Sequence, residues 1–178
     1  MRRLAIWLTL VTLAGVTSQP LLSEDSAAIR KQIEANYEKV KKATLAHSVE
    51  AVNECRKEIE TADAIFIDSK GDIYPIRPVG QEYLSFAKSI VSYEHTIKKF
   101  TVSGNTADVW VDIKETRTEA AKRDARDTRV QERRVTSIEH TKDTWIKTPA
   151  GWRRSMREEV APRDIKEEEE SAAPPTTK

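Results

Sequence analysis

The sequence predicts a single small α+β domain in which N-terminal helices pack on a curved antiparallel sheet. Apolar residues recur every three or four positions up to about residue 60, which is the period of an amphipathic helix. From residue 94 onward the period changes to two, which is the period of a half-buried strand. The chain has 178 residues, enough for one domain and little else.

Three amphipathic helices are predicted along the chain. The first begins near Ser23 and carries an apolar stripe of Ile29, Ile33, Tyr37, Val40 and Thr44. Ser48 is a suitable cap for a second, shorter helix with Val49, Val52 and Ile59 on its apolar face. After Gly80, a third helix is predicted to carry Tyr83, Leu84, Phe86, Ala87, Ile90 and Val91.

Strands are predicted between and after these helices. A short apolar run at 64–68 ends in the turn residues 69–72 and reads as a strand followed by a turn. A long strand at 96–102 precedes the turn 103–105. In the next strand Val109, Val111 and Ile113 alternate with polar residues and Trp110. Two more strands are expected at roughly 130–147 and 152–160, joined by the turn 148–151.

The two ends of the chain lie outside this domain, which we expect to span 23–160. Residues 1–22 begin with Arg2 and Arg3, continue with an apolar run of about a dozen residues and end in small residues, as in a signal peptide. The run is too short to span a bilayer. We therefore expect an exported protein, periplasmic or secreted, with no stable membrane span after cleavage. Residues 161–178 have no apolar period and predict a disordered acidic, proline-rich tail.

Charge and composition restrict the function classes. The 30 basic and 29 acidic side chains are interleaved, so no strong field attracts nucleic acid, and we expect no nucleic-acid partner. The segment 114–134 carries both signs, which favours a salt-bridged hairpin extension over a basic arm. Cys55 is the single cysteine and excludes an intramolecular disulfide. His47, His95 and His140 show no short metal-ligand spacing, so neither a metal nor a cofactor is expected.

Three stretches carry a resemblance to a known family. Residues 66–74 are similar to its first strand and turn, 102–109 to the hairpin between its long strands, and 143–153 to its closing hairpin. In this order, over roughly residues 26–160, they resemble the nuclear-transport-factor-two-like superfamily, which includes ketosteroid isomerase and the SnoaL-like polyketide cyclases. The resemblance implies a cone-shaped, cystatin-like α+β fold with an apolar-walled pocket, and in many members a dimer through the outer sheet face. The family includes enzymes and non-catalytic binding domains, so its fold does not settle function.

Candidate residues follow from this resemblance and from strand parity. An isomerase of this fold needs a carboxylate base in the pocket and a facing acid. Asp68 is a weak candidate for the base, whereas Asp112 points away from the pocket if the neighbouring valines face the helices. The candidates for the pocket lining are Tyr37, Phe66, Tyr83, Phe86, Val111, Arg154, Met156 and Glu158. Trp110, on the opposite sheet face, and Trp145 are the candidates for a dimer interface.

No local motif marks catalysis, so whether the chain is an enzyme stays open, with a non-catalytic role favoured. The leading interpretation is an exported small-ligand-binding or accessory domain with an apolar pocket, forming a homodimer. One alternative is a small lyase or isomerase of the ketosteroid-isomerase or SnoaL-like type. A second alternative is a structural envelope-interaction module that uses the charged hairpin. A pocket carboxylate facing a tyrosine or histidine favours the enzyme, whereas a filled apolar interior favours the structural module.

Overall fold

The computed structural model describes residues 25–120 and 132–169, which form three helices and six strands. The elements in chain order are α1 (Ser26–Leu45), α2 (Val49–Ile59), β1 (Glu60–Ile67), β2 (Ile73–Pro75), α3 (Tyr83–Ser89), β3 (Ile90–Ser103), β4 (Thr106–Ala120), β5 (Glu132–Thr148) and β6 (Gly151–Glu169). The predicted signal peptide at 1–22 and residues 170–178 of the predicted tail lie outside the described residues.

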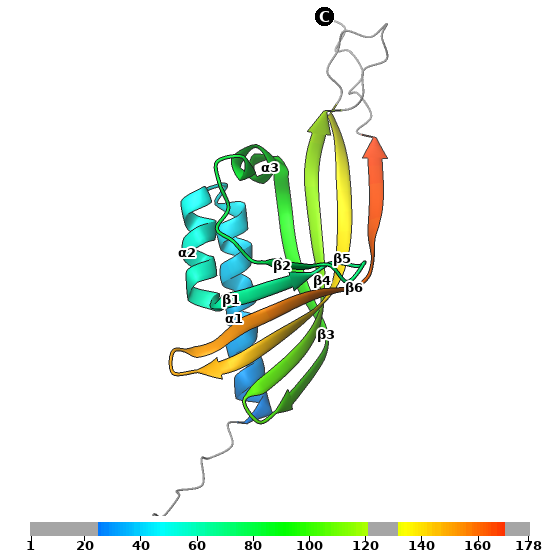
Figure 1. Ribbon diagram of the computed structural model, residues 1–178. Coiled ribbons are helices and arrows are strands. Elements are labelled where there is room, and N and C mark those ends of the chain that lie inside the picture. Colours follow the sequence, from blue (N-terminus) through cyan, green and yellow to red (C-terminus); the bar gives the residue numbers. More distant parts are fainter. Residues whose placement is uncertain (1–24, 121–131, 170–178) are drawn as a thin grey trace, which may run out of the picture.

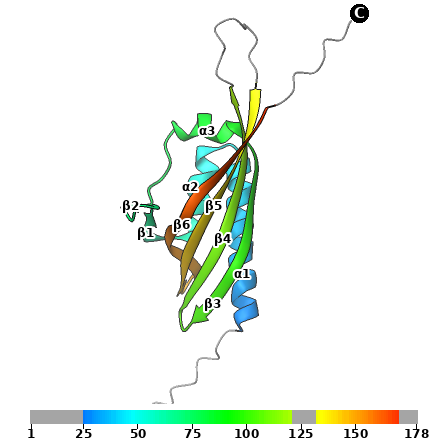
Figure 2. The same cartoon turned by 90° about the vertical axis from the view of Figure 1, so that its right-hand side faces the viewer.

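The six strands form one sheet in the order β2-β1-β6-β5-β4-β3. β1 runs parallel to β6, and the other neighbouring strands are antiparallel. Helices α1 and α2 lie together on one side of the curved sheet (Figure 1). The turned view shows β3 to β6 running side by side with a pronounced twist (Figure 2). The predicted class, α+β with N-terminal helices on a curved antiparallel sheet, is confirmed.

The hydrophobic core lies between α1 and the inner face of the sheet. The side chain of Asp25 caps α1 by accepting a hydrogen bond from the Ala27 amide. The apolar stripe of α1 then buries Ile29, Ile33 and Tyr37 against the strands, as its spacing predicts. Their partners in the core are Ala107, Val109, Val111, Trp145 and Trp152. This packing places α1 over the inner face of the sheet from β3 to β6.

The third helix is shorter than predicted. It ends at Ser89, and Ile90 and Val91 begin strand β3. Ile90 is buried whereas Val91 is 53% exposed, which is the alternation of a strand. Two consecutive β-branched residues also favour the extended conformation. Here the local preference for a strand prevails over an apolar pattern that also fits a helix.

The last strand is longer than predicted. β6 continues to Glu169, so residues 161–169, assigned to the tail from the sequence, pair with β5. The charges that argued against a strand complement each other across it, because Arg133 on β5 forms a 2.6 Å ion pair with Glu167. The same arginine contacts Glu119 on β4 at 3.1 Å. The ends of β4, β5 and β6 therefore project past the helices as a salt-bridged extension (Figure 1). Residues 121–131 of the charged segment lie outside the described residues.

Candidate functional site

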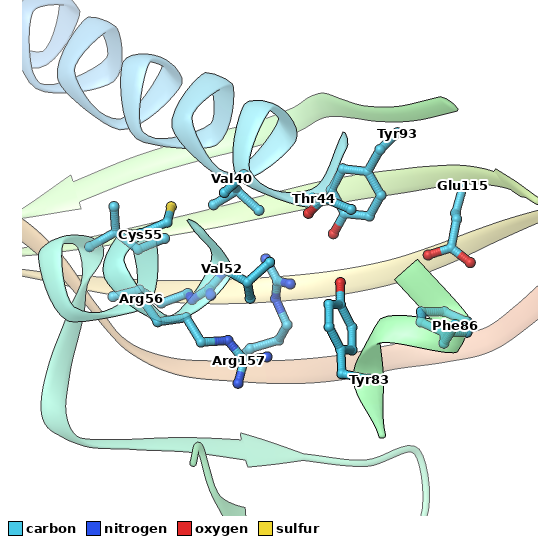
Figure 3. A pocket seen from close by; sticks show the side chains of 13 residues that line it. Val40, Thr44, Val52, Cys55, Arg56, Tyr83, Phe86, Tyr93, Glu115 and Arg157 are labelled. Atoms are coloured by element: carbon cyan, nitrogen blue, oxygen red, sulfur yellow. The ribbon is translucent and has the colours of Figure 1, made fainter. Parts of the chain in front are cut away.

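A pocket of about 160 Å³ lies between the helices and the inner face of the sheet. α1, α2, α3 and the strands β3, β4 and β6 all contribute to its wall (Figure 3). The lining residues are Val40, Ala43, Thr44, Val52, Cys55, Arg56, Ile59, Tyr83, Phe86, Tyr93, Glu115, Arg154 and Arg157. This volume is similar to that of an engineered protein cavity that binds benzene. The pocket therefore has room for a single ring or a short branched chain.

Two phenols supply neutral hydrogen-bond donors to this pocket. The hydroxyl groups of Tyr83 and Tyr93 point toward the same central space, with Phe86 and Glu115 to one side (Figure 3). Burial raises the pKa of Tyr93 to about 12 and also raises the pKa of Tyr83. Both phenols therefore keep their protons at neutral pH and can donate to an oxygen of a ligand.

Two arginines form the polar end of the pocket, and a buried carboxylate holds them in place. Asp143 on β5 is fully buried and accepts hydrogen bonds from Nε and Nη2 of Arg157, both at 2.7 Å. Nη1 of Arg154 lies 3.2 Å from the same carboxylate, and its Nη2 pairs with the buried carboxylate of Glu60. The hydroxyl of Tyr37 donates to Asp143 from α1 at 2.9 Å. The two guanidinium charges are thus balanced by two carboxylates without any ligand.

An irregularity in β6 allows both arginines to face the helices. Asp143 pairs with Arg157 and Trp145 pairs with Arg154, so β6 holds one more residue than β5 over this interval. Such a bulge reverses the alternation of side chains along a strand. Arg154 and Arg157 are three positions apart and would lie on opposite faces of a regular strand, but here both line the pocket.

The ion-pair network keeps Asp143 ionised and unavailable as a base. Burial alone would raise the pKa of Asp143, but the charges of Arg157 and Arg154 hold it well below its usual range. Burial alone would likewise lower the pKa of Arg157, and the Asp143 carboxylate raises it above its ordinary value. Because both carboxylate oxygens accept donors from Arg157, neither is free to remove a proton from a ligand. The network therefore fixes the positions of the two arginine side chains at the pocket.

His95 on β3 lies beside this network as a neutral side chain. Its ring centroid is 4.6 Å from that of Tyr37 and 5.1 Å from that of Tyr93. Burial, reinforced by the charge of Arg157, lowers the pKa of His95 to about 3. Its Nε2 is buried and has no hydrogen-bond partner among the described residues. Cys55 is also kept neutral, because burial raises the pKa of its thiol.

The structure brings together only part of the set of pocket residues nominated from the sequence. Tyr83, Phe86 and Arg154 line the pocket, whereas Tyr37 reaches it only through Asp143. Val111 belongs to the hydrophobic core. Phe66 stacks on Tyr74 with ring centroids 6.4 Å apart and is not part of the lining.

Two other nominated residues lie on the outer face of the sheet. Met156 pairs with Thr144 and Glu158 with Lys142, and antiparallel partners share a face. Thr144 in turn hydrogen-bonds to Asp108 on the outer face of β4. Met156 and Glu158 would face the helices if the last strand alternated regularly from Trp152, but the bulge turns them outward and puts Arg157 on the inner face instead.

The two aspartates considered as bases do not enter the pocket. Asp68 accepts hydrogen bonds from the amides of Lys70 and Asp72 at 2.9 and 3.0 Å, which closes the turn between β1 and β2. Asp112 lies on the outer face, paired with His140 at 2.8 Å and with Lys98 at 3.1 Å. Val109 and Val111 are buried against α1. Because they face the helices, Asp112 points away from the pocket, as expected from the sequence.

The two tryptophans nominated for the dimer lie on opposite faces. Trp110 is on the outer face, with Nζ of Lys99 and of Lys142 at 4.4 and 5.3 Å from its ring centroid. Trp145 is fully buried in the core, which removes it from any interface on the outer face. It pairs with Ala107, two positions from Val109, and so shares the inward parity of the valines.

Most of the lining was not nominated from the sequence, and four of the missed residues are charged groups of this site. Arg157 and Glu60 were hidden because no local pattern marks the bulge or the buried end of α2. Asp143 could have been found, because it lies two positions before Trp145 in a predicted strand and therefore shares its face. Glu115 lies in the charged segment, whose composition suggested exposure.

The described residues contain no helix long and apolar enough to cross a membrane. Within the same residues, no cluster of three or more histidine, cysteine, aspartate or glutamate side chains could hold a metal ion.

No protein-family model and no curated protein sequence matches the chain. Solved structures do match. The Kfla4162 protein from Kribbella flavida has a TM-score of 0.53 at 11% identity, with 79% of this chain and 95% of that chain covered. An NTF2-like protein of unknown function from Prochlorococcus marinus has a TM-score of 0.50 at 17% identity, with 72% and 89% covered. The hexachlorocyclohexane dehydrochlorinase LinA-type3 from Novosphingobium barchaimii has a TM-score of 0.49 at 11% identity, with 83% and 93% covered.

These likenesses concern the fold and not the sequence. The curled sheet, the two N-terminal helices and the pocket between them are the features that the resemblance implied. The chain therefore has the nuclear-transport-factor-two-like (NTF2-like) α+β fold.

Proposed function

We propose that this protein is an exported, non-catalytic domain that binds a small ligand in the pocket between α1, α2 and the sheet. The observation that carries the proposal is the pocket wall, in which apolar side chains of α1 and α2 face polar groups that include Arg56, Arg154 and Arg157. Ligand sites are typically apolar cavities with a few well-placed polar groups. A filled interior would have favoured the structural module instead.

The chemistry of the wall restricts the ligand. Arg154 and Arg157 are already neutralised by Asp143 and Glu60, so no ligand charge is needed to balance them. Both arginines and the two phenols are hydrogen-bond donors, so the ligand is expected to carry an oxygen that accepts hydrogen bonds from them. We therefore propose a compact ring or branched chain that carries a carbonyl, hydroxyl or carboxylate oxygen.

Three probes of matched shape test this proposal. Toluene, benzyl alcohol and benzoate share one ring and differ in their oxygen atoms. We expect saturable NMR shifts of the Tyr83 and Tyr93 ring signals with the two oxygen-bearing probes at millimolar concentration, and weaker shifts with toluene. Ala43→Leu fills the pocket and should abolish the shifts. Ala35→Leu, the same change on the exposed side of α1, is the control. Equal responses of both variants, or no saturable shift, would refute the proposal.

A lyase or isomerase is the second candidate, because one carboxylate does line the pocket beside two phenols. Glu115 on β4 contributes to the lining together with Tyr83 and Tyr93, and its carboxylate lies 3.4 Å from Nη1 of Arg117. An enzyme that moves a proton between carbons would exchange the α-hydrogens of a small ketone with solvent. We expect no deuterium exchange into cyclohexanone above the rate in buffer. Exchange that Glu115→Gln abolishes would replace the binding proposal with the enzymatic one.

A further inference from the structure

A second groove, distinct from the pocket above, lies between α2, the start of β1 and the loop after β2. Its volume is about 260 Å³, and Arg56 is the only residue that lines both sites. The groove forms where β1 leaves its neighbour. Glu60 pairs with Arg154 and Ile65 with Met156, so residues 61–64 bulge out of the parallel ladder. We call this site the α2–β1 groove.

Hydrogen bonds hold the walls of the α2–β1 groove in place. The side-chain amide of Asn53 on α2 donates to the carbonyl of Val79 at 3.0 Å and accepts from its amide at 2.8 Å. Nη1 of Arg56 donates to the carbonyl of Arg77 at 2.6 Å. The loop after β2 is thus tied to α2 at two points, so the groove exists before any ligand arrives. A preformed site avoids the ordering cost of binding.

The α2–β1 groove carries an excess of positive charge. Four cationic side chains line it, against the single carboxylate of Glu60. That carboxylate is already paired with Arg154 on the far side, in the network around Asp143. The cations are Arg56, Lys57, Arg77 and Arg153. Lys57 is paired with the exposed carboxylate of Glu54 at 2.6 Å, so the three arginines carry the excess. This local excess contrasts with the near-neutral chain as a whole, whose formal net charge is +1.

Two buried donors beside the groove lack acceptors. Oγ1 of Thr61 and Nε of Arg153 have no hydrogen-bond partner among the described residues. Nη1 of Arg153 donates hydrogen bonds to the backbone carbonyls of Lys57 and Glu60, at 3.3 and 3.4 Å. A buried donor without a partner costs free energy, and a small shift of either side chain toward the groove would let a ligand oxygen supply the missing acceptor.

We propose that the α2–β1 groove binds a small oxyanion of the phosphate class. A tetrahedral anion offers acceptor oxygens in several directions, which suits arginines converging from α2, the loop and β6. It also balances the excess charge and places acceptors next to Thr61 and Arg153. Free inorganic phosphate and a phosphate monoester share this chemistry, and the experiment distinguishes them.

The test is an NMR and calorimetric titration of the full chain with inorganic phosphate, phenyl phosphate and acetate, with ionic strength held constant by sodium chloride. We expect saturable binding of the two phosphates, with shifts at Thr61 and Arg153. Tighter binding of phenyl phosphate would indicate an ester as the ligand, and equal or tighter binding of inorganic phosphate would indicate the free ion. Acetate binding as tightly as phosphate, or no saturable response to either phosphate, would overturn the proposal.

Variants that each remove one charge distinguish phosphate binding in the groove from general electrostatic attraction to a positive surface. The Arg77 side chain is exposed, and only its backbone carbonyl ties the loop, so Arg77→Gln should keep the fold. We expect it to weaken phosphate binding about tenfold, as expected for a lost hydrogen bond to a charged group. Thr61→Val should weaken binding less, through the lost hydroxyl alone. Lys88→Gln removes one exposed charge from α3 outside the groove and should leave binding unchanged. Equal losses in Arg77→Gln and Lys88→Gln would overturn the proposal.

Discussion

The hydroxyl of Tyr37 donates a 2.9 Å hydrogen bond to the carboxylate of Asp143, which joins the first helix to the middle of β5. Nε1 of Trp145 donates to the same hydroxyl at 3.4 Å. Because Asp143 also holds Arg154 and Arg157, one buried carboxylate connects α1 to both pocket arginines. The fold and the candidate site therefore depend on the same group.

We predict that Asp143→Asn is severely destabilising although it changes the shape of the side chain very little. The amide leaves the buried Arg157 guanidinium without a carboxylate partner and Arg154 with Glu60 alone, and breaking a buried ion pair costs about 3–5 kcal/mol. Tyr37→Phe removes one hydrogen bond and keeps the charges, so it should cost about 1–2 kcal/mol. Urea unfolding measures both.

A double variant keeps this prediction testable if Asp143→Asn fails to fold. Adding Arg157→Gln removes the guanidinium charge that Asp143→Asn leaves unbalanced and should recover part of the lost free energy of unfolding. Equal costs for Asp143→Asn and Tyr37→Phe, or a double variant less stable than the sum of its parts, would contradict the role assigned to the carboxylate.

We predict that His95 makes the protein less stable in mild acid. Its pKa is lowered to about 3 in the folded chain, against 6.5 ordinarily. Between these values the unfolded chain binds a proton that the folded chain excludes, so stability falls as the pH falls through this window. At about pH 4.5 the loss is about 3 kcal/mol. His95→Phe, compared with the wild type in urea unfolding at several pH values, should show a flatter dependence.

Other titrating groups are common to both chains and cancel in this comparison. Burial raises the pKa of Glu139, and a hydrogen bond to Asp112 raises the pKa of His140. Both contributions favour the folded state more as the pH falls, which is opposite in sign to that of His95. Parallel curves for the wild type and His95→Phe would show that the histidine is protonated in the folded protein.

The parts of the fold that depend on local periodicity were predictable, and those that depend on strand pairing were not. The stripe of Ile29, Ile33 and Tyr37 identified α1 because a helix buries one face. The alternation of Val109 and Val111 identified the inner face of β4 for the same kind of reason. Neither pattern reveals the pairing register of β5 and β6, and therefore neither reveals that β6 has one extra residue at the bulge.

The candidate site was harder to predict because its residues meet through that pairing. A bulge of one residue decides whether Arg157 or Met156 faces the helices, and a single sequence carries no local mark of it. The end of β6 was missed for a related reason. Its charges suggest a solvated tail when taken alone, and they become compatible with a strand only beside Arg133.

We predict that a chain ending at residue 160 folds but is slightly less stable. The cut removes the part of β6 that pairs with β5 beyond Val160, including ion pairs of Asp164 with His140 and of Arg163 with Glu139. All these partners are partly exposed, and such pairs contribute about 0–1 kcal/mol each. Ile165 is 60% exposed, so little apolar burial is lost.

A chain ending at residue 169 is the matched control for this truncation. It keeps the whole of β6 and removes only 170–178, which have no apolar period, so its melting temperature should equal that of the full chain. Thermal melts of the three chains test both statements. A chain ending at 160 that is unfolded at room temperature would show that the end of β6 is essential to the sheet.

The last prediction is that the protein is a homodimer through the outer sheet face, with Trp110 near the twofold axis. The ring projects from β4 on the face opposite the core, is partly exposed, and is contacted by the ammonium groups of Lys99 and Lys142. Burial of the remaining apolar area stabilises an interface by about 25 cal/mol per Å². A second copy of the same face offers this cover by symmetry, and the lysines can keep their contacts with the ring at the rim.

Trp110→Glu should therefore give a folded monomer, because two facing carboxylates would repel each other at the twofold axis while the core is untouched. In the monomer the new carboxylate can pair with Lys99 or Lys142, so the fold loses little. Lys70→Glu also introduces a carboxylate, in the turn between β1 and β2, and should leave the dimer intact. Sedimentation velocity at tens of micromolar compares the three chains. A wild type that sediments as a monomer would show that the lysines alone are sufficient cover for the ring.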